Sequence, residues 1–410
     1  MVRRVTDLDL IADPSLSLPA EWEHWLGVAD EVADELRSDA VEREAAADLP
    51  EAEVELLRSR GLLGIALPAA AGGDGLPFAL AAQVTRRIAR ADASIAHILG
   101  YHYGWTRILA HYDTETTRRM LAATAAQKWL WASPGTARHT GPIRLRRDGD
   151  RMILNGEVGF ATGAPVAQRL FTQVIDAESG RLNVVAVDPA AQGLTIGGDW
   201  DMLGQRLTAS RSLSFVDVVV PARELIAELG PVTELQDPFA SVAVLNFQLM
   251  FGVIQLGITE GALLEARAFT RERSMPWSHA SVSEAGEDPF ILNGYGEFVA
   301  AAQSAAAAVV RGERRLQWLH DQGTAVTAEA RAAVAEAIAG AKITATTTAL
   351  TVTSGIYDLT GARSAGTKYG LDRFWRNART LSLHDPIAYK LNEVGRYFLN
   401  GEAPRPSIYR

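Results

Sequence analysis

The tripeptide His-Asp-Pro at residues 384–386 places a titratable imidazole directly beside a carboxylate. Such a pair suits general acid or base catalysis near neutral pH. The same three residues also form a favoured helix start, in which Asp385 caps a helix that runs from Pro386. The two roles are compatible, and we predict that His384 lies in a catalytic site.

Arg271 and Arg273 lie near the end of a long helical segment, in ARAFTRERSMPW. A guanidinium group suits phosphate because its donors form a planar fork. Arginines at a helix end also commonly lie in solvent, near the negative end of the helix dipole. The eight histidines show no HExxH or comparable spacing, so we predict no metal site.

The composition limits the class of protein. With 410 residues, 48% of them hydrophobic, the chain can bury a large core in one unit or in two to three domains. A formal net charge of -9 argues against nucleic-acid binding, and the absence of cysteine excludes disulfides and thiolate chemistry. We see no export signal in MVRRVTDLDLIADPS. We also expect charges or glycines to interrupt each apolar run before the ~20 residues that span a bilayer. These observations favour a cytoplasmic enzyme that acts on small molecules.

Three groups of elements must position these residues. From about residue 19 to 130, apolar residues recur at three- and four-residue spacing, which predicts helices. Short β-rich runs such as RMILNGEVGF and LNVVAVD follow, and long Ala-rich helical stretches continue from about residue 239. We therefore predict an N-terminal helical domain (1–130), a central β domain (131–232) and a C-terminal helical domain (233–410).

This order of elements carries local motifs that resemble acyl-CoA dehydrogenases over nearly the whole chain. They include LRSRGLLGIALPAAAGGDGL, LNGEVGFATGA and MLGQRLTASRSLSFVDVVVP. The resemblance implies the α+β fold of that superfamily, with N-terminal helices, a central β-barrel or sandwich and a C-terminal four-helix bundle. It also implies a homotetramer that packs through the C-terminal helices.

The C-terminal segment RFWRNARTLSLHDPIAYKLNEVGRYFLNG, with GYHYGW and EDPFILNGYGEF, is similar to dibenzothiophene monooxygenases and related flavin-dependent oxygenases. That resemblance implies the oxygenase component of a two-component system. Reduced FMN from a separate NAD(P)H:flavin reductase would react with O2 through a C4a-hydroperoxyflavin. The oxygen would go to sulfur as a first guess, or to nitrogen or an activated aromatic carbon of a small molecule.

Two other functions are compatible with the sequence. One is an acyl-CoA dehydrogenase with FAD, in which Asp385 is the base. The sequence TVTSGIYDLTG lacks the glycine pair with which dehydrogenases receive the adenine half of FAD, which favours FMN. The other is a helical assembly protein that keeps only the fold.

The resemblance also implies site residues. The implied catalytic residues are His102, Thr162, His384 and Asp385. The implied flavin contacts are Trp131, Ser133, Phe160, Thr162, Gly163, Ala164, Arg271 and Arg273. The implied substrate pocket contains Tyr101, Tyr103 and Met275. Residues 162–164 could instead form an ordinary turn, and Trp131, Phe160 and His102 could be core residues.

Overall fold

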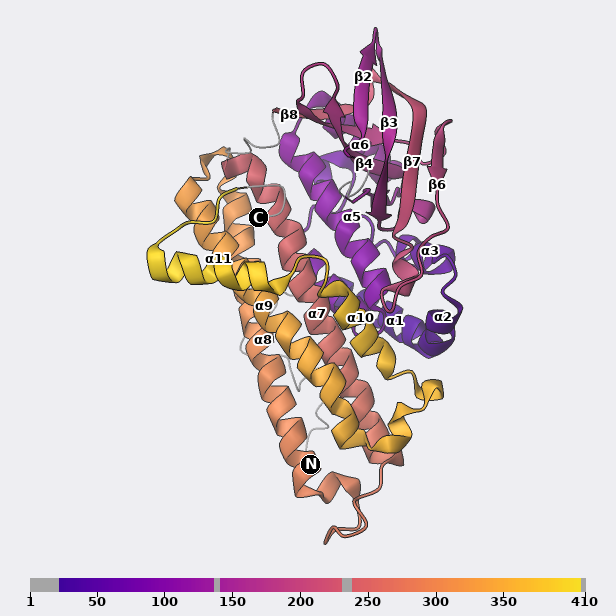
Figure 1. Ribbon diagram of the computed structural model, residues 1–410, viewed down its shortest axis with the longest axis vertical. Helices are drawn as coiled ribbons and strands as arrows, with labels where there is room; N and C mark the ends of the chain where they lie inside the picture. The colour runs from indigo at the N-terminus through magenta and orange to yellow at the C-terminus, as the bar shows by residue number, and fades with distance from the viewer. Residues whose placement is uncertain (1–21, 136–140, 231–237, 407–410) are drawn as a thin grey trace.

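The computed structural model describes residues 22–135, 141–230 and 238–406. Its elements fall into three successive groups along the chain (Figure 1). The first group is α1 (Glu23–Ser38), α2 (Ala40–Ala46), α3 (Glu51–Ser59), α4 (Phe78–Ala89), α5 (Ala93–Tyr112) and α6 (Glu115–Gln127). The second is β1 (Trp131–Ala132), β2 (Arg144–Asp148), β3 (Arg151–Ala161), β4 (Arg169–Asp176), β5 (Leu182–Val187), β6 (Leu194–Ile196), β7 (Arg211–Pro221) and β8 (Leu225–Gly230). The third is α7 (Pro238–Arg273), α8 (Pro289–Asp321), α9 (Ala328–Thr360), α10 (Asp372–Leu381) and α11 (Ile387–Asn400).

The strands form one 8-stranded mixed sheet in the order β6-β7-β3-β2-β4-β5-β8, with β1 beside β4. Strands β2 and β3 pair antiparallel, with Arg144 opposite Asn155, whereas β1 pairs parallel to β4, with Trp131 opposite Arg169. Figure 1 shows the sheet at one end of the molecule and α5 between it and the C-terminal helices. The predicted order of helical, β and helical parts is confirmed.

Helix α7 lies between the N-terminal helices α4 and α5 and the C-terminal helices α8, α9 and α10, all of which it contacts. It contains an 18-residue window with a mean hydropathy of 1.7, so by length and composition it could cross a membrane. The expectation that no apolar run would be long enough was therefore wrong for this helix. Because 72% of the window is buried inside the protein, α7 has the burial of a bundle's core helix.

Glycines let α7 approach its neighbours closely. A Cβ atom added to Gly257 would lie 2.5 Å from the backbone oxygen of Arg86, and one added to Gly261 would lie 2.1 Å from that of Arg90. On α5, a Cβ at Gly104 would lie 2.4 Å from the ring of Phe247 on α7. A side chain at Gly257 or Gly261 would therefore push α4 away from α7, and one at Gly104 would displace the ring of Phe247.

A buried charge cluster joins α4 to α7. Glu260 is fully buried, and its carboxylate accepts hydrogen bonds from Arg86 Nε at 3.0 Å and from Arg90 Nε at 2.6 Å. Burial alone raises the pKa of Glu260, but the charges of Arg86 and Arg90 outweigh it and hold the pKa below its usual range. The cluster thus keeps one anion and two cations inside the protein.

We expect Glu260→Ala to lower the free energy of unfolding by about 3–5 kcal/mol, because it leaves two buried guanidinium groups without their anion. Urea denaturation at neutral pH measures the change. The matched control is Arg60→Ala, which removes exposed ion pairs to Glu31 and Glu35. It should change stability by about 1 kcal/mol or less. Equal effects of the two substitutions would contradict the prediction.

Candidate active site

One face of α5 presents His97 and Tyr101, which lie one helical turn apart and are both buried. The side chain of Asp92 caps this helix by accepting hydrogen bonds from the amides of Ser94 and Ile95. The His97 and Tyr101 rings contact each other edge to face at 4.5 Å between centroids. The same face therefore carries a titratable ring and a phenol in direct contact.

The turn after α10 brings His384 to this face. Its Nε2 lies 2.9 Å from the hydroxyl of Tyr101, although the two residues are 283 positions apart. Its ring centroid lies 4.3 Å from that of Phe251 on α7, and Phe251 also lies 6.0 Å from His97. His384 thus joins the α5 face, as expected of a site residue.

Asp385 is held by two buried side chains from other helices. Its Oδ2 accepts hydrogen bonds from Gln248 Nε2 at 2.7 Å and from Lys342 Nζ at 2.9 Å, and its Oδ1 lies 3.6 Å from His384 Nδ1. Burial opposes ionisation, but His384, Lys342 and Gln248 together hold the pKa of Asp385 well below its usual range. Helix α11 has Pro386 at its N-cap and no side-chain cap, so the alternative in which Asp385 caps the helix was wrong.

His97 is the site residue that the sequence interpretation missed most clearly. Its Nδ1 lies 3.0 Å from Oε1 of Gln205. Because that oxygen is an acceptor, Nδ1 carries the hydrogen and Nε2 is left as an acceptor. Burial, reinforced by the nearby His384, lowers the pKa of His97 to about 3, although the hydrogen bond to Gln205 acts in the opposite direction. His97 is therefore neutral near pH 7.

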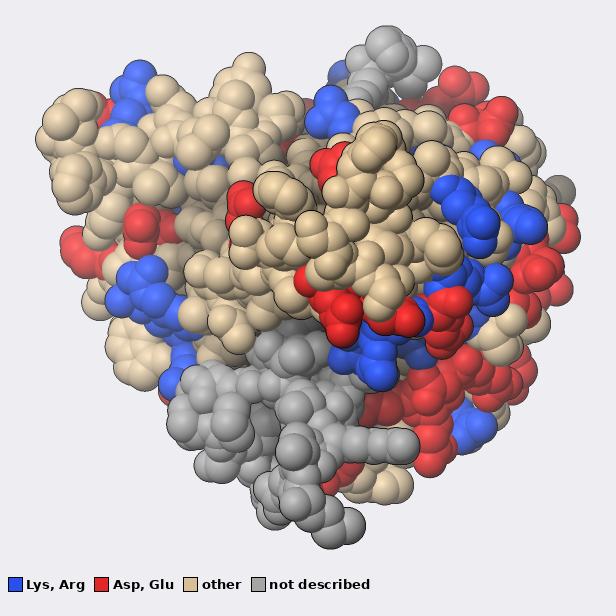
Figure 2. Space-filling model, turned by 90° about the horizontal axis from the view of Figure 1, so that it is seen from below, with Lys and Arg blue, Asp and Glu red and all other residues tan. Residues whose placement is uncertain are grey.

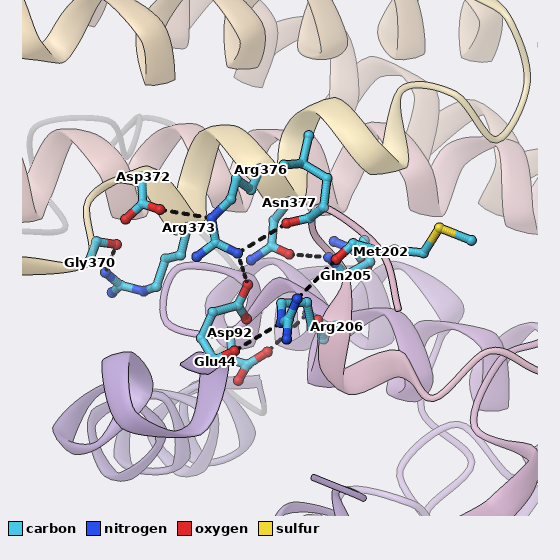
Figure 3. A network of polar contacts seen from close by, with 12 residues as sticks. Glu44, Asp92, Met202, Gln205, Arg206, Gly370, Asp372, Arg373, Arg376 and Asn377 are labelled. Atoms are coloured by element: carbon cyan, nitrogen blue, oxygen red, sulfur yellow. Dashed lines mark hydrogen bonds and ion pairs between the residues drawn. The ribbon is translucent and has the colours of Figure 1, made fainter. Parts of the chain in front are cut away.

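A network of polar contacts fixes Gln205 (Figure 3). Gln205 has a positive φ of 55°, its backbone amide donates to Asn377 Oδ1 on α10, and its carbonyl accepts from Trp200 Nε1 at 2.9 Å. In the same network, Arg376 of α10 donates to Glu44 of α2 at 2.8 Å. The partner of His97 is thus held where α2, α10 and the β domain meet.

The predicted flavin-binding loop, residues 162–164, joins the same region. Thr162 Oγ1 lies 2.8 Å from Ser210 Oγ, and the amide of Gly163 donates to the carbonyl of Thr208 at 2.8 Å. Thr208 in turn donates to the carbonyl of Gln205 at 2.8 Å. A Cβ at Gly163, where φ is 72°, would lie 3.4 Å from Ile98, the neighbour of His97. The loop therefore lies against α5 beside His97.

Two further predicted residues flank this loop. Ser133 forms an isolated β-bridge with Thr162, and Ala164 is fully buried. Phe160 is 43% exposed and contacts Trp200 edge to face at 6.0 Å. Ser133 and Ala164 thus lie with the loop, and Phe160 lies at its exposed edge.

Three other predicted residues lie away from the His97–Tyr101 face. His102 is fully buried, with Nε2 2.9 Å from the carbonyl of Leu63 and Nδ1 3.2 Å from the amide of Trp131. Tyr103 donates to the carbonyl of Leu62 at 2.7 Å. The indole of Trp131 donates to Thr124 Oγ1 at 2.8 Å within a second core cluster. Both ring nitrogens of His102 are therefore engaged in joining α5 to neighbouring segments.

Arg271, Arg273 and Met275 are also separated from the site. They follow Phe251 by 20 residues or more, which is roughly 30 Å along a helix. Arg273 lies over the ring of Tyr369 at 5.6 Å, and Met275 is 78% exposed. Within one chain these residues therefore lie far along α7 from the His97–Tyr101 face.

Known proteins match most of the chain. The acyl-CoA dehydrogenase N-terminal domain family matches residues 26–128, and the C-terminal domain family matches residues 249–388. A probable FMNH2-dependent monooxygenase of Pseudomonas putida is 35% identical over 388 residues, which cover 94% of this chain and 97% of that protein. The chain belongs to the flavin-dependent monooxygenases with the acyl-CoA dehydrogenase fold. The predicted family is confirmed.

Two further relatives of this monooxygenase are dibenzothiophene monooxygenases. That of Rhodococcus erythropolis is 35% identical over 396 residues, which cover 93% of this chain and 95% of that enzyme. The solved structure of FMN-bound TdsC from Paenibacillus sp. A11-2 has a TM-score of 0.91 and 35% identity, and covers 95% of this chain and 100% of TdsC. The predicted fold is therefore that of a monooxygenase with a solved FMN complex.

The monooxygenase also has a partly open pocket on the far side of Phe247 from Tyr101, which we call the aromatic pocket. Its lining is Trp105, Ile108, Tyr112, Phe171, Gln173, Val184, Leu229, Ala240, Ser241, Ala243, Val244 and Phe247. Phe247 lies 5.2 Å from Tyr101 between ring centroids, and Trp105 stacks on Phe171 at 4.6 Å. Flat apolar molecules suit such a lining.

The structural role of His102 predicts a pH effect on stability. Burial lowers the pKa of His102 to about 4, below the value of about 6.5 in an unfolded chain. Between these two pKa values His102 binds a proton in the unfolded chain but not in the folded protein. The free energy of unfolding therefore keeps its full value above about pH 6.5 and falls as the pH decreases toward 4. We expect this histidine to contribute a slope of about 1.4 kcal/mol per pH unit.

Urea denaturation of the parent protein and of His102→Gln between pH 7 and pH 5 measures this contribution. The variant is less stable at pH 7, because it loses a buried hydrogen bond, but its stability should fall less steeply as the pH decreases. Parallel pH dependences in the two proteins would contradict a buried neutral His102.

Proposed function

We propose that this monooxygenase is the oxygenase component of a two-component system. It takes reduced FMN from a separate NAD(P)H:flavin reductase, in the cytoplasm, and transfers one atom of O2 to the sulfur of a small apolar molecule. The names of its relatives, which include FMNH2 and dibenzothiophene, support this proposal. The observation that carries it is a site in which two histidines from different elements, buried His97 and partly exposed His384, contact one tyrosine, Tyr101.

The polar groups of the site fit the ring of FMN. Among the described residues, Nε2 of His97 and Nε2 of Gln205 are buried atoms with no hydrogen-bond partner, as expected where a ligand binds. We propose that Thr162, Gly163 and Ala164, with Ser133 beside them, hold the polar edge of the ring. Reduced FMN, when bound, supplies the electrons that activate O2, and the second oxygen atom leaves as water.

The two histidines have different proposed roles. His97 stays neutral, and its free Nε2 accepts a hydrogen bond. Asp385 lies beside Nδ1 of His384, so the ring can keep a proton on Nδ1. Nε2 of His384 can then donate a proton to the Tyr101 hydroxyl or accept one from it. The two roles differ because the side-chain amide of Gln205 lies beside His97, whereas the carboxylate of Asp385 lies beside His384. We leave His102 out of the catalytic residues, because both of its ring nitrogens are engaged.

The environment of Asp385 argues against the acyl-CoA dehydrogenase alternative. A base that removes an α-proton needs a pKa near the working pH. Lys342 and Gln248 bind the Asp385 carboxylate and, despite burial, help to hold its pKa well below the usual range. Asp385 is therefore a poor proton acceptor, and the oxygenase function is the better supported of the two.

The distance of Arg271 and Arg273 from the site leads us to propose a homotetramer. If these arginines bind the phosphate of FMN, they bind it in a neighbouring subunit. Apolar side chains on α11 are exposed in the single chain, among them Phe398 at 89% and Leu399 at 81%. Burial of such side chains between subunits would stabilise an assembly.

The aromatic pocket supports an apolar sulfur compound as the substrate. Among the described residues its lining has the polar side chains Tyr112, Gln173 and Ser241 but no charged residue. An aromatic sulfur heterocycle could stack on Trp105 and Phe247 there, close to Tyr101. On the face seen in Figure 2, acidic and basic side chains are intermixed, which suits a small neutral substrate rather than a phosphate polymer.

Incubation of the purified protein with FMN, NADH, a flavin reductase and dibenzothiophene under ¹⁸O2 tests this function. We expect a sulfoxide that contains one ¹⁸O atom. Hydrogen peroxide without an oxygenated product from any sulfur heterocycle, together with reduction of bound FAD by an acyl-CoA, would instead support the dehydrogenase alternative.

The two neighbouring tyrosines of α5 provide a matched pair of variants. Tyr101→Phe removes the hydroxyl that contacts His384, and we expect product formation to fall by about 10²-fold or more. Tyr103→Phe removes a hydroxyl bound to the carbonyl of Leu62 and should lower stability by about 1 kcal/mol while preserving turnover. Equal turnover by the two variants would remove Tyr101 from the mechanism.

A further inference from the structure

A lysine lies behind the His384–Asp385 pair, inside the helical bundle. Lys342 on α9 is 3% exposed, and its Nζ lies 2.9 Å from Asp385 Oδ2 and 3.0 Å from Gln248 Oε1. The same ammonium lies 4.7 Å from the ring centroid of Phe251. Phe251 thus contacts both this cation and His384.

Burial of this ammonium has an energetic consequence. A cation inside a protein is stable only with an anion and with hydrogen-bond acceptors for its protons. Burial lowers the pKa of Lys342, and the charge of Asp385 acts in the opposite direction. A methionine or leucine would fill the same space between helices without this requirement. An ion pair at this place therefore calls for an explanation beyond packing.

The contacts also orient the carboxylate. Lys342 and Gln248 both bind Oδ2 of Asp385, whereas Oδ1 is the oxygen nearer His384, at 3.6 Å from Nδ1. With Oδ2 held in this way, rotation of the carboxylate is restricted. The charge of the lysine also offsets the charge of the carboxylate. Both effects reach the imidazole through Asp385.

We propose that Lys342 is a positioning residue for the oxygen-transfer reaction, one that acts on His384 through Asp385. It directs Oδ1 of Asp385 toward Nδ1 of His384. Its positive charge also reduces the stabilisation that the Asp385 carboxylate gives to the doubly protonated imidazole. Nε2 of His384 is then free to exchange a proton with Tyr101. The catalytic meaning of this inference rests on the proposed function, whereas the electrostatic effect on His384 does not.

Other charged or titratable groups lie near His384 or near the ion pair behind it. Tyr101 and His97 of α5 and Asp385 of the same turn face His384. Lys390 and Glu393 of α11, which form an ion pair at 3.3 Å, act on Lys342. Helix α7 contributes Gln248 and Phe251, which carry no charge. Lys342 is thus the cation that touches the partner of His384, whereas Lys390 is a buried cation bound to Glu393.

Removal of the lysine charge should change the protonation of His384. Without Lys342 the Asp385 charge is no longer offset, so the imidazole keeps its second proton to higher pH. We expect Lys342→Met to move the midpoint of the His384 titration upward, because the charge of Asp385 is then unopposed. Lys342→Arg keeps the charge and should restore the parent midpoint.

Modification by diethyl pyrocarbonate measures this midpoint, because the reagent reacts with neutral imidazole. The His384 side chain is 41% exposed, and peptide mass spectrometry reports its modification separately from the other histidines. The rate is measured from pH 5 to pH 9 on the full-length parent protein, Lys342→Met, Lys342→Arg and the matched control Lys390→Met. If Lys342→Met does not fold, Lys342→Gln replaces it, since glutamine keeps a donor for Asp385 without the charge.

The expected result is an upward shift in Lys342→Met, recovery in Lys342→Arg and a clearly smaller shift in Lys390→Met. An unchanged midpoint in Lys342→Met, or equal shifts in Lys342→Met and Lys390→Met, would overturn the inference. The readout needs neither FMN nor a sulfur substrate. Failure of the parent protein to form a sulfoxide would therefore count against the proposed function and leave the test of Lys342 intact.

Discussion

The contact between Tyr101 and His384, 2.9 Å from hydroxyl to ring nitrogen, is the interaction on which the site depends. It joins helix α5 of the N-terminal part to the turn that follows α10, near the end of the chain. It can form only if α7 holds both elements, since Phe251 of α7 contacts the rings of Tyr101 and His384. The close approach of α5 to α7 at Gly104 supplies this geometry. Packing on α7 thus brings together two polar residues that are distant in the sequence.

Around this contact, two imidazoles of the same chemical type are held in different electrical environments. His97 is bound to the neutral amide of Gln205, whereas His384 lies beside Asp385. Each arrangement needs support from far away in the sequence, Asn377 for Gln205 and Lys342 for Asp385. Burying the polar side chains of Asn377 and Lys342 costs free energy. In return, His97 stays neutral while His384 exchanges a proton.

Much of the fold could be predicted from the sequence, and less of the site. The order of helices and strands followed from periodicity, and the motifs identified the family. The turn at His384 and the loop at Thr162 were recognised because their residue types lie together in short motifs. His97 had a signal that was overlooked, its spacing of four residues from Tyr101 on one helix. The sequence carries no comparable signal for Gln205 and Lys342, because only the packing of α9, α10 and the β domain brings these residues close to the histidines. His102 shows the reverse case, since its aromatic neighbours in GYHYGW suggested a pocket although its nitrogens bind backbone groups.

The central claim is that FMN binds where residues 162–164, His97 and Gln205 meet, beside the Tyr101–His384 contact. A crystal structure of the protein with FMN bound tests it most directly. The account predicts that the ring lies against residues 162–164, with the buried Nε2 atoms of His97 or Gln205 facing the ligand. It also predicts that the phosphate lies near Arg271 or Arg273 of another subunit. A flavin bound elsewhere, with His97 and Gln205 still enclosed and without a ligand, would contradict the account.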